Sequence, residues 1–204
     1  MCDFCCEGLP PGGAEVDVAV LFADVRGSTG LAEQMGARAF AELLNRFYGT
    51  ATDILVRRDA IVDKMIGDEV MALFLPGYCG PDYPMHAVAA AEELLRAVGH
   101  GAPGKPWLPL AAGIHAGTAF VGNVGGGGVT DFTALGDTVN VAARLQGEGR
   151  NGEIILSDTV YRQVEARYPQ AEGRVVALRG REEPMTVRVL RLGNDDADDG
   201  ADGS

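Results

Sequence analysis

The sequence predicts an α+β domain, in which a sheet carries helices on one face. Apolar runs of strand length mix with segments of helical periodicity, without the regular strand–helix alternation of a doubly wound fold. Two of these runs are joined by Gly67-Asp68, which is typical of an antiparallel hairpin. The chain has 204 residues, of which 47% are hydrophobic, so it is long enough for one domain with a substantial core.

Charge and hydropathy exclude several classes of protein. The net charge of −12 argues against binding to a nucleic-acid backbone as the main task. No apolar run approaches the roughly 20 residues that a membrane-spanning helix needs. The first residues lack the basic start and long apolar stretch of a secretory signal. We therefore expect a cytoplasmic protein with no membrane segment in this chain.

Both ends of the chain differ in composition from the centre. Residues 1–15 contain Cys2, Cys5 and Cys6, followed by a run of proline and glycine at 10–13. These thiols belong to a flexible terminus or the remnant of a longer chain, or they form part of a zinc or iron–sulfur site that another segment completes. Residues 193–204 carry five Asp and no base, so we expect a disordered tail. The main domain is expected over residues 16–192.

The first half of this domain is predicted to contain strands, helices and one hairpin. A buried strand is expected over 16–23, followed by a long helix over about 30–56 that bends near Gly36 and is capped by Ser28 or Thr29. The hairpin pairs 60–66 with 70–75. Residues 76–84 are expected to form a loop, and 84–98 a second helix with a one-sided apolar stripe.

The second half is predicted to contain shorter elements. Strands are expected over 108–115 and 119–124, joined by a turn at 116–118. The glycine run 125–128 is expected to be flexible, and it lacks the Gly-Lys-Ser/Thr ending of a phosphate-binding P-loop. Helices are expected over 138–146 and 157–166, a strand over 153–156, and a final strand pair over 175–178 and 185–192.

Two aspartates lie where divalent metal would be held. Asp24 ends the first apolar run, and Asp68 lies in the hairpin turn. Hard cations such as Mg²⁺ prefer oxygen ligands and often keep phosphate as a further ligand. This pair therefore indicates chemistry on a nucleotide.

Four segments of the chain resemble those of class III nucleotidyl cyclases. They are LFADVRGST at 21–29, KMIGDEVMA at 64–72, GIHAG at 113–117 and FTALGDTVNVAARL at 132–145. The resemblance extends in order from about residue 16 to 192. It implies a ferredoxin-like βαββαβ core with a mainly antiparallel sheet and added C-terminal strands. It also implies a phosphorus–oxygen lyase for signal transduction, which converts a nucleoside triphosphate to a 3′,5′-cyclic monophosphate and pyrophosphate.

The resemblance assigns the metal and phosphate contacts. Asp24 and Asp68 match the family's metal-binding aspartates and would hold two Mg²⁺ or Mn²⁺ ions, with the carbonyl of Val25 as a further ligand. Two such metals lower the pKa of the attacking 3′-hydroxyl and neutralise the triphosphate. The turn formed by Arg26, Gly27, Ser28 and Thr29 leads into a helix, whose first N–H groups attract phosphate oxygens.

Lys64 and Thr133 match the positions that contact the purine. Adenylyl cyclases resemble this chain in carrying a lysine at the first position. The ammonium group of lysine can donate to adenine N1 but cannot accept from guanine N1–H. Thr133 replaces the usual Asp, as in some bacterial members, and its oxygen can accept from the adenine amino group. The resemblance therefore favours ATP as the substrate.

Three further residues match catalytic or phosphate-binding positions. Asn140 and Arg144 lie four apart on one helix face. By resemblance Asn140 orients the ribose, and Arg144 stabilises the charge that builds on the α-phosphate. Arg181 aligns with a basic residue that binds the terminal phosphates. Thr118 stands where some members carry another phosphate-binding Arg.

The family's active sites lie between two catalytic domains. One chain supplies the aspartates, and its partner supplies the purine-binding residues together with Asn140 and Arg144. This chain contains both sets, so a homodimer would have two equivalent sites. The first hypothesis is an adenylyl cyclase; the alternatives are a guanylyl or mixed-purine cyclase, or a catalytically weak nucleotide-binding domain that regulates a partner.

Overall fold

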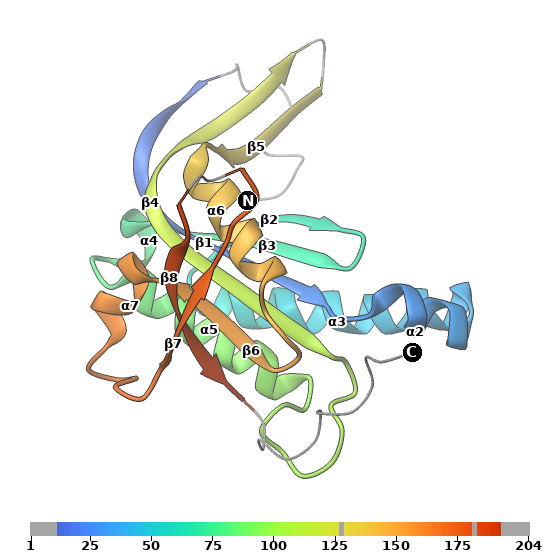
Figure 1. Ribbon diagram of the computed structural model, residues 1–204. Coiled ribbons are helices and arrows are strands. Elements are labelled where there is room, and N and C mark those ends of the chain that lie inside the picture. The colour runs from blue at the N-terminus through green and yellow to red at the C-terminus, as the bar shows by residue number, and fades with distance from the viewer. Residues whose placement is uncertain (1–11, 127–128, 181–182, 193–204) are drawn as a thin grey trace.

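The computed structural model describes residues 12–126, 129–180 and 183–192, which form one sheet flanked by helices (Figure 1). The sheet has eight strands, seven of them in the order β2-β3-β1-β4-β6-β8-β7, and β5 pairs with β4. Their bounds are β1 Gly12–Val25, β2 Ile61–Ile66, β3 Glu69–Phe74, β4 Leu110–Gly126, β5 Val129–Leu135, β6 Glu153–Ser157, β7 Glu172–Val176 and β8 Met185–Arg191. The helices are α2 Ser28–Met35, α3 Ala37–Arg57, α4 Pro76–Cys79, α5 Tyr83–Ala97, α6 Asp137–Gly147 and α7 Asp158–Val164.

The predicted fold class is confirmed. Strands β2, β3, β1 and β4 are antiparallel neighbours in the order of a ferredoxin-like βαββαβ unit. Strand β6 joins this unit in parallel with β4; β8 then pairs antiparallel with β6, and β7 pairs antiparallel with β8. These are the added C-terminal strands.

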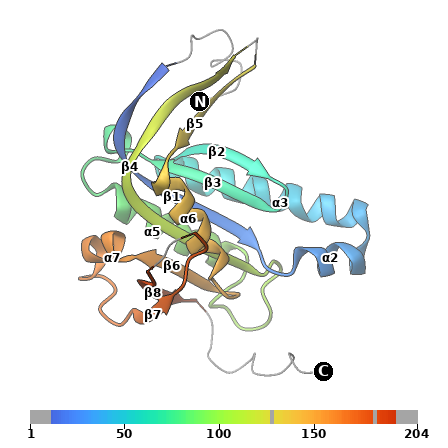
Figure 2. The same ribbon diagram turned by 45° about the horizontal axis from the view of Figure 1, so that its top comes forward.

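Helices cover both faces of the sheet, so the expectation of helices on one face is wrong. On one face Ala19, Leu21 and Ala23 of β1 join a core cluster with residues of α3, α5 and α7. On the other face Val18, Val20 and Phe22 cluster with Ala142 of α6. Figures 1 and 2 show α6 on the opposite side of the sheet from α3 and α5. Both faces of β1 are therefore buried, each under a different set of helices.

Strand β4 is one continuous strand, not the predicted two. The expected turn at 116–118 pairs in register with β1, where Gly117 lies opposite Val18 and Thr118 opposite Asp17. The Thr118 hydroxyl also donates to Oδ1 of Asp17 over 3.1 Å. The long partner strand holds these residues extended. Of the glycine run 125–128, for which flexibility is predicted, Gly125 and Gly126 continue β4, and residues 127–128 lie outside the described residues. The hairpin strand β5 was not predicted.

Smaller differences follow from local chemistry. Residues 76–79 form the single turn α4, which begins at Pro76, where the fixed φ of proline suits a helix start. Helix α2 begins at Ser28 and is preceded by Gly27, at φ 67°, so neither Ser28 nor Thr29 caps it. Strand β7 lies at Glu172–Val176, earlier than the predicted 175–178. The long helix divides at Gly36, as expected.

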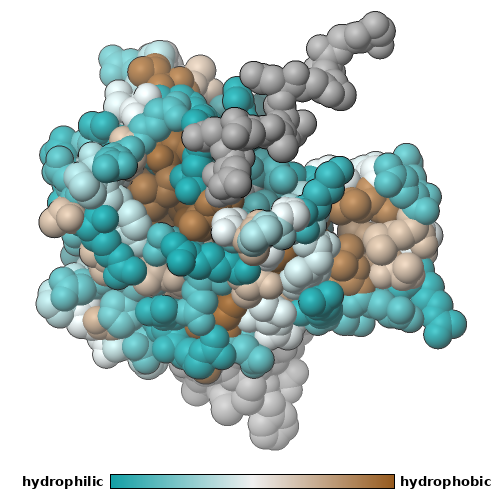
Figure 3. Space-filling view, turned by 90° about the horizontal axis from the view of Figure 1, so that it is seen from below, coloured by the Kyte–Doolittle hydropathy of each residue, from teal (hydrophilic) through white to brown (hydrophobic). Residues whose placement is uncertain are grey.

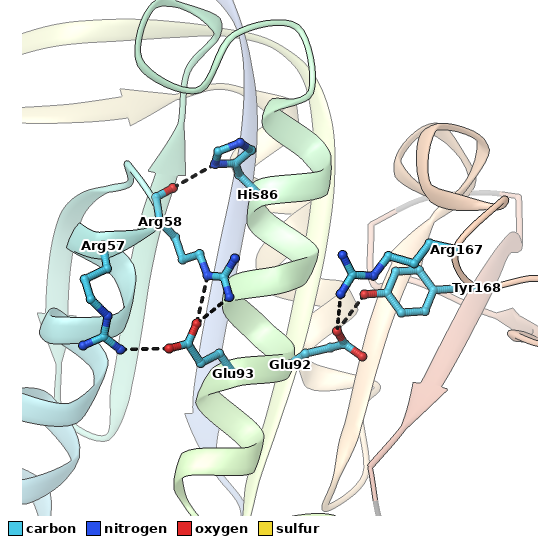
Figure 4. A network of polar contacts seen from close by, with 7 residues as sticks. All are labelled: Arg57, Arg58, His86, Glu92, Glu93, Arg167 and Tyr168. Carbon is cyan, nitrogen blue, oxygen red and sulfur yellow. Dashed lines mark hydrogen bonds and ion pairs between the residues drawn. The ribbon is translucent and has the colours of Figure 1, made fainter.

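Charged side chains fix α5 to its neighbours on the helical face (Figure 4). Glu93 accepts hydrogen bonds from Arg57 at 2.8 Å and from Nε of Arg58 at 2.8 Å, both at the end of α3. The preceding residue, Glu92, points to another side of the helix and accepts from the hydroxyl of Tyr168 at 2.7 Å. Helix α5 is therefore tied to α3 on one side and to the segment after α7 on the other.

The described residues also bear on membrane association. Within 12–126, 129–180 and 183–192, no helix is both long enough and apolar enough to cross a membrane. Cys2, Cys5 and Cys6 and the acidic tail lie outside these residues, so the predictions for both ends stay predictions.

Candidate active site

Asp24 and Asp68 meet at one end of the central strands. Asp24 is the penultimate residue of β1 and lies opposite Glu69, the first residue of β3. The N–H of Val25 donates to the carbonyl of Asp68 over 3.3 Å, which joins the end of β1 to the hairpin turn. Burial and the negative charge of Asp68 raise the pKa of Asp24. The structure therefore brings the two predicted metal-binding aspartates together.

Glu69 adds a third carboxylate that the sequence analysis did not assign. Burial, and then the charges of Asp24 and Asp68, raise the pKa of Glu69 to about 7. A cation bound between these groups would remove the repulsion that raises both pKa values. In the sequence, the only indication of a role for Glu69 is its position directly after the turn. The register of β1 with β3 places Glu69 opposite Asp24.

The available ligands fit a cation that takes part of its coordination from the protein and the rest from a nucleotide. Within the described residues no cluster of three or more His, Cys, Asp or Glu side chains is arranged to hold a metal on its own. Two carboxylates and a backbone carbonyl would leave positions for phosphate oxygens, which is how Mg²⁺ is usually bound. A metal here would thus depend on the substrate for part of its coordination.

Two side chains outside the carboxylate group bind Asp24. Arg26 donates to Oδ2 of Asp24 at 2.9 Å, and Nε2 of Gln146, on α6, donates to the same oxygen at 3.1 Å. Gln146 could not be predicted as part of the site, because it reaches Asp24 only through the packing of α6 on the sheet. The two donors hold the carboxylate in place at the strand end.

The predicted phosphate turn lies beside this carboxylate group. Gly27 adopts φ 67°, a left-handed conformation that glycine tolerates, and leads directly into α2. Ser28 and Thr29 line an open cleft of about 480 Å³ together with Gly67 and Asp68. Hydrophobic surface gathers on the projecting α2–α3 arm (Figure 3), and Phe40 contributes to the same cleft. The turn and the hairpin thus face one space.

A second group contains the two predicted purine-binding residues. Lys64 of β2 forms an ion pair with Asp131 of β5, and the Thr133 hydroxyl donates to Oδ2 of Asp63 at 2.8 Å. Burial raises the pKa of Asp63, whereas the bond from Thr133 and the charge of Lys64 lower it. Lys64 and Thr133 therefore lie side by side, although they are far apart in the sequence.

Asn140 and Arg144 lie on α6, on the other face of the sheet from α3 and α5. Asn140 is exposed and Arg144 is half-buried. A Cβ atom on Gly180 would lie 3.5 Å from Nη2 of Arg144, so this loop passes close to the guanidinium. Among the described residues, no hydrogen bond or ion pair joins Asn140 or Arg144 to Asp24 or Asp68. Arg181 lies outside the described residues.

Comparisons with known proteins agree with this geometry. The family described as "Adenylate and Guanylate cyclase catalytic domain" matches residues 13–191. An adenylate cyclase of Anabaena cylindrica is 29% identical over 197 residues, which cover 91% of this chain and 39% of that protein. The chain spans 34% to 39% of the length of three curated relatives, that protein included.

Solved structures show the same fold. The adenylyl cyclase CyaB from P. aeruginosa superposes with a TM-score of 0.75 at 28% identity, over 88% of this chain and 96% of that one. The guanylyl cyclase Cya2 superposes with a TM-score of 0.76 at 26% identity, over 91% and 98%. The family match extends over nearly all described residues and includes all four recognised segments. The chain therefore belongs to the class III adenylate and guanylate cyclase catalytic domain family.

Proposed function

We propose that this domain is an adenylyl cyclase, which converts ATP to 3′,5′-cyclic AMP and pyrophosphate at sites shared by two copies of the chain. The observation that carries the proposal is the grouping of the predicted residues. Asp24, Asp68 and the phosphate turn share one end of the sheet, and Lys64 and Thr133 share another place, between β2 and β5. The names of the relatives favour a cyclase reaction on either purine.

Asp24 and Asp68 would hold two Mg²⁺ or Mn²⁺ ions, which supply activation of the 3′-hydroxyl and neutralise the leaving pyrophosphate. The N–H groups at the start of α2 would bind the phosphate chain beside them. Asn140 would orient the ribose, and Arg144 would stabilise the negative charge that grows on the α-phosphate. Arg181 would bind the terminal phosphates. These roles rest on the family resemblance and stay predictions.

ATP is favoured over GTP by the chemistry of Lys64. Its ammonium group has three donors and no acceptor, so it can bind adenine N1 but not guanine N1–H. The Thr133 oxygen can accept from the 6-amino group, which guanine lacks. A guanylyl or mixed-purine activity is the second candidate, because the guanylyl cyclase Cya2 shares the fold at 26% identity.

A homodimer follows from the separation of the residue groups. In one chain the described residues provide no bond between the aspartates and the pair Asn140 and Arg144, although all four are needed at one substrate. A two-fold partner would bring one group to the other and create two equivalent sites. Exposed hydrophobic residues on the hairpin and β5, namely Met65, Ile66 and Leu135, provide apolar surface for such an association.

Product analysis tests this proposal. Purified protein incubated with ATP and Mn²⁺ is expected to release cyclic AMP, and to release less cyclic GMP from GTP. Asp24→Ala is expected to remove both activities. Cyclic GMP as the main product would favour the second candidate. If neither nucleotide gives a cyclic product and the variant is indistinguishable from wild type, the proposed cyclase activity is wrong. The remaining hypothesis is then a nucleotide-binding regulatory domain.

A further inference from the structure

A bulge in β2 turns two consecutive side chains toward β5. The register with β3 shifts between Val62 and Lys64, so Asp63 is the extra residue. In a regular strand Asp63 and Lys64 would point to opposite faces, but a bulge re-aims side chains locally. Both of them contact β5, where Asp131 and Thr133, two residues apart, share a face. β2 and β5 lie near one another in Figure 2.

Asp63 is a buried carboxylate that the proposed mechanism does not use. Its side chain is 0% exposed, whereas that of Lys64 is 29% exposed. Oδ2 accepts the Thr133 hydroxyl at 2.8 Å. Oδ1 accepts no hydrogen bond from the described residues, and its nearest cation, Nζ of Lys64, is 3.7 Å away. Burying a carboxylate in this way is costly, which indicates a role that depends on it.

The bond from Thr133 fixes the polarity of its hydroxyl. A hydroxyl has one proton to donate and two lone pairs to accept. Because an ionised carboxylate only accepts, the proton of Thr133 must point to Asp63. The Thr133 oxygen then presents only lone pairs to any further partner. Such an oxygen can accept from an amino group, but it cannot donate to a carbonyl.

The geometry points to Asp63 as a specificity-determining positioning residue: it holds the Thr133 hydroxyl as an acceptor, so that the purine site takes a 6-amino purine and disfavours a 6-oxo purine. This role rests on the proposed function, since it assumes that Thr133 faces the base. Lys64 would bind N1 of the base. Purines without a 6-amino group also carry N1, so this contact does not depend on that group. Asp63 acts on the 6-position through Thr133, whereas its longer contact with Lys64, at 3.7 Å, bears on N1, which both test substrates carry.

The test compares two substrates that differ only at position 6. ATP has the 6-amino group, and purine riboside 5′-triphosphate lacks it but keeps N1. At pH 8, Asp63→Asn is expected to lower kcat/KM for ATP about tenfold, the usual effect of losing one well-aligned hydrogen bond. The value for purine riboside triphosphate should stay within about twofold, and discrimination against GTP should weaken. A general structural defect would lower the values for both substrates equally.

Matched variants separate the two residues. Thr133→Val removes the hydroxyl at nearly constant volume, and adding Asp63→Asn to it is expected to cause no further loss of preference. Thr133→Ser should retain the preference. Asp131→Asn is the control, because Asp131 contacts Lys64 and should change both substrates alike. Asp63→Ala is measured beside Asp63→Asn, because Oδ1 of an asparagine can still accept from Thr133, whereas alanine frees the hydroxyl. Circular dichroism checks that both variants fold.

Three outcomes would overturn the role of Asp63. Equal losses for both triphosphates would show a structural effect. Additive losses in the double variant would show that Asp63 does not act through Thr133. Wild-type protein that cyclises ATP, together with Asp63→Asn and Asp63→Ala variants that both keep the full preference for ATP, would refute the role and leave the proposed function intact. No cyclic product from wild type would refute the proposed function, and this role with it.

Discussion

Arg26 competes with any cation for Asp24. Its guanidinium donates to Oδ2 of Asp24 at 2.9 Å, and the two side chains are 23% and 24% exposed. A metal that binds Asp24 must share or displace this contact. Arg26 therefore provides the counter-charge of Asp24, which a metal at the proposed site would have to replace.

We predict that Arg26→Ala raises the affinity for Mn²⁺ in the absence of nucleotide. The increase should be a few-fold, because an ion pair of this kind contributes about 1 kcal/mol. Titration of Mn²⁺, followed by its electron paramagnetic resonance signal, measures this directly. Arg38→Ala is the matched control, since Arg38 pairs with Glu42 on an exposed helix face, and it should leave the affinity unchanged. Weaker binding in Arg26→Ala would contradict the competition.

Site residues within short motifs could be predicted from the sequence, and those set by strand pairing could not. Asp24 and Asp68 lie in recognisable segments, and the structure brings them together as expected. Glu69 and Asp63 reach their positions through the register of β1 with β3 and through a bulge in β2. Neither feature has a signal in the residue pattern, because register depends on partner strands that lie far away in the chain.

At the scale of elements, the contact of α6 with β4 depends on Gly113. A Cβ atom at this position would lie 2.1 Å from the backbone N of Gln146 and 2.8 Å from the carbonyl of Ala142. No side chain fits there unless α6 moves away from the sheet. Because α6 carries Asn140, Arg144 and Gln146, this single glycine positions the helix on which the proposed catalytic residues lie.

We predict that Gly113→Ala lowers the free energy of unfolding by about 3 kcal/mol or prevents folding, as expected for overpacking against backbone. The control is Gly49→Ala on α3, where a Cβ atom meets nothing within 4 Å. That substitution should stabilise the protein by about 0.5–1 kcal/mol, since alanine favours a helix interior. Urea unfolding measures both. A Gly113→Ala variant as stable as wild type would show that α6 packs less closely.

Glu153 connects the C-terminal strands to one another. It is 3% exposed and accepts hydrogen bonds from Arg174 at 2.9 and 2.7 Å and from Arg191 at 3.1 Å. Burial would raise its pKa, but Arg174, the N–H of Arg150 and Arg191 together lower the pKa of Glu153 to about 2. A carboxyl with a lowered pKa stabilises the fold above its ordinary pKa of 4.5, and this contribution is lost as the pH falls toward 2.

We predict that Glu153→Gln lowers the free energy of unfolding at pH 7 by about 2–3 kcal/mol, because it leaves buried donors with a weaker acceptor. The difference from wild type should shrink as the pH falls below 4.5. Chemical denaturation at pH 7 and pH 3 provides the comparison. A loss of equal size at both pH values would mean that the charge of Glu153 contributes nothing.

The elements that could be predicted are those with a clear period of their own. Helix α5 and the β2–β3 hairpin agree with the prediction to within about two residues. The prediction of two strands in place of β4 was wrong. Ala116-Gly117-Thr118 has the composition of a turn, but pairing with β1 keeps this segment extended. The position of α6 on the opposite face could not be predicted, since its apolar stripe fits either face of a sheet.

At the scale of the whole molecule, each chain holds two incomplete groups of residues. The carboxylates and the predicted phosphate turn lie at the end of β1, and the predicted purine-binding pair lies between β2 and β5. The described contacts place Gln146 of α6, but neither Asn140 nor Arg144, against Asp24. In the proposed function, all of them act at one nucleotide in a site formed by two chains.

Mixing two inactive variants tests the shared site most directly. Asp68→Asn disables one residue group and Arg144→Ala the other. When the two variants are co-expressed with different tags, random pairing makes half of the dimers mixed, each with one intact site, so about a quarter of wild-type activity should return. Asp24→Asn with Asp68→Asn is the control, and it should return none because both changes lie in one group.

The measurement is the rate of cyclic AMP formation by the doubly tagged dimer with ATP and Mn²⁺. We predict that the Asp68→Asn and Arg144→Ala pair recovers activity that each variant lacks alone, while the control pair stays inactive. A doubly tagged dimer of Asp68→Asn and Arg144→Ala that forms but makes no cyclic AMP would contradict a site assembled from two chains.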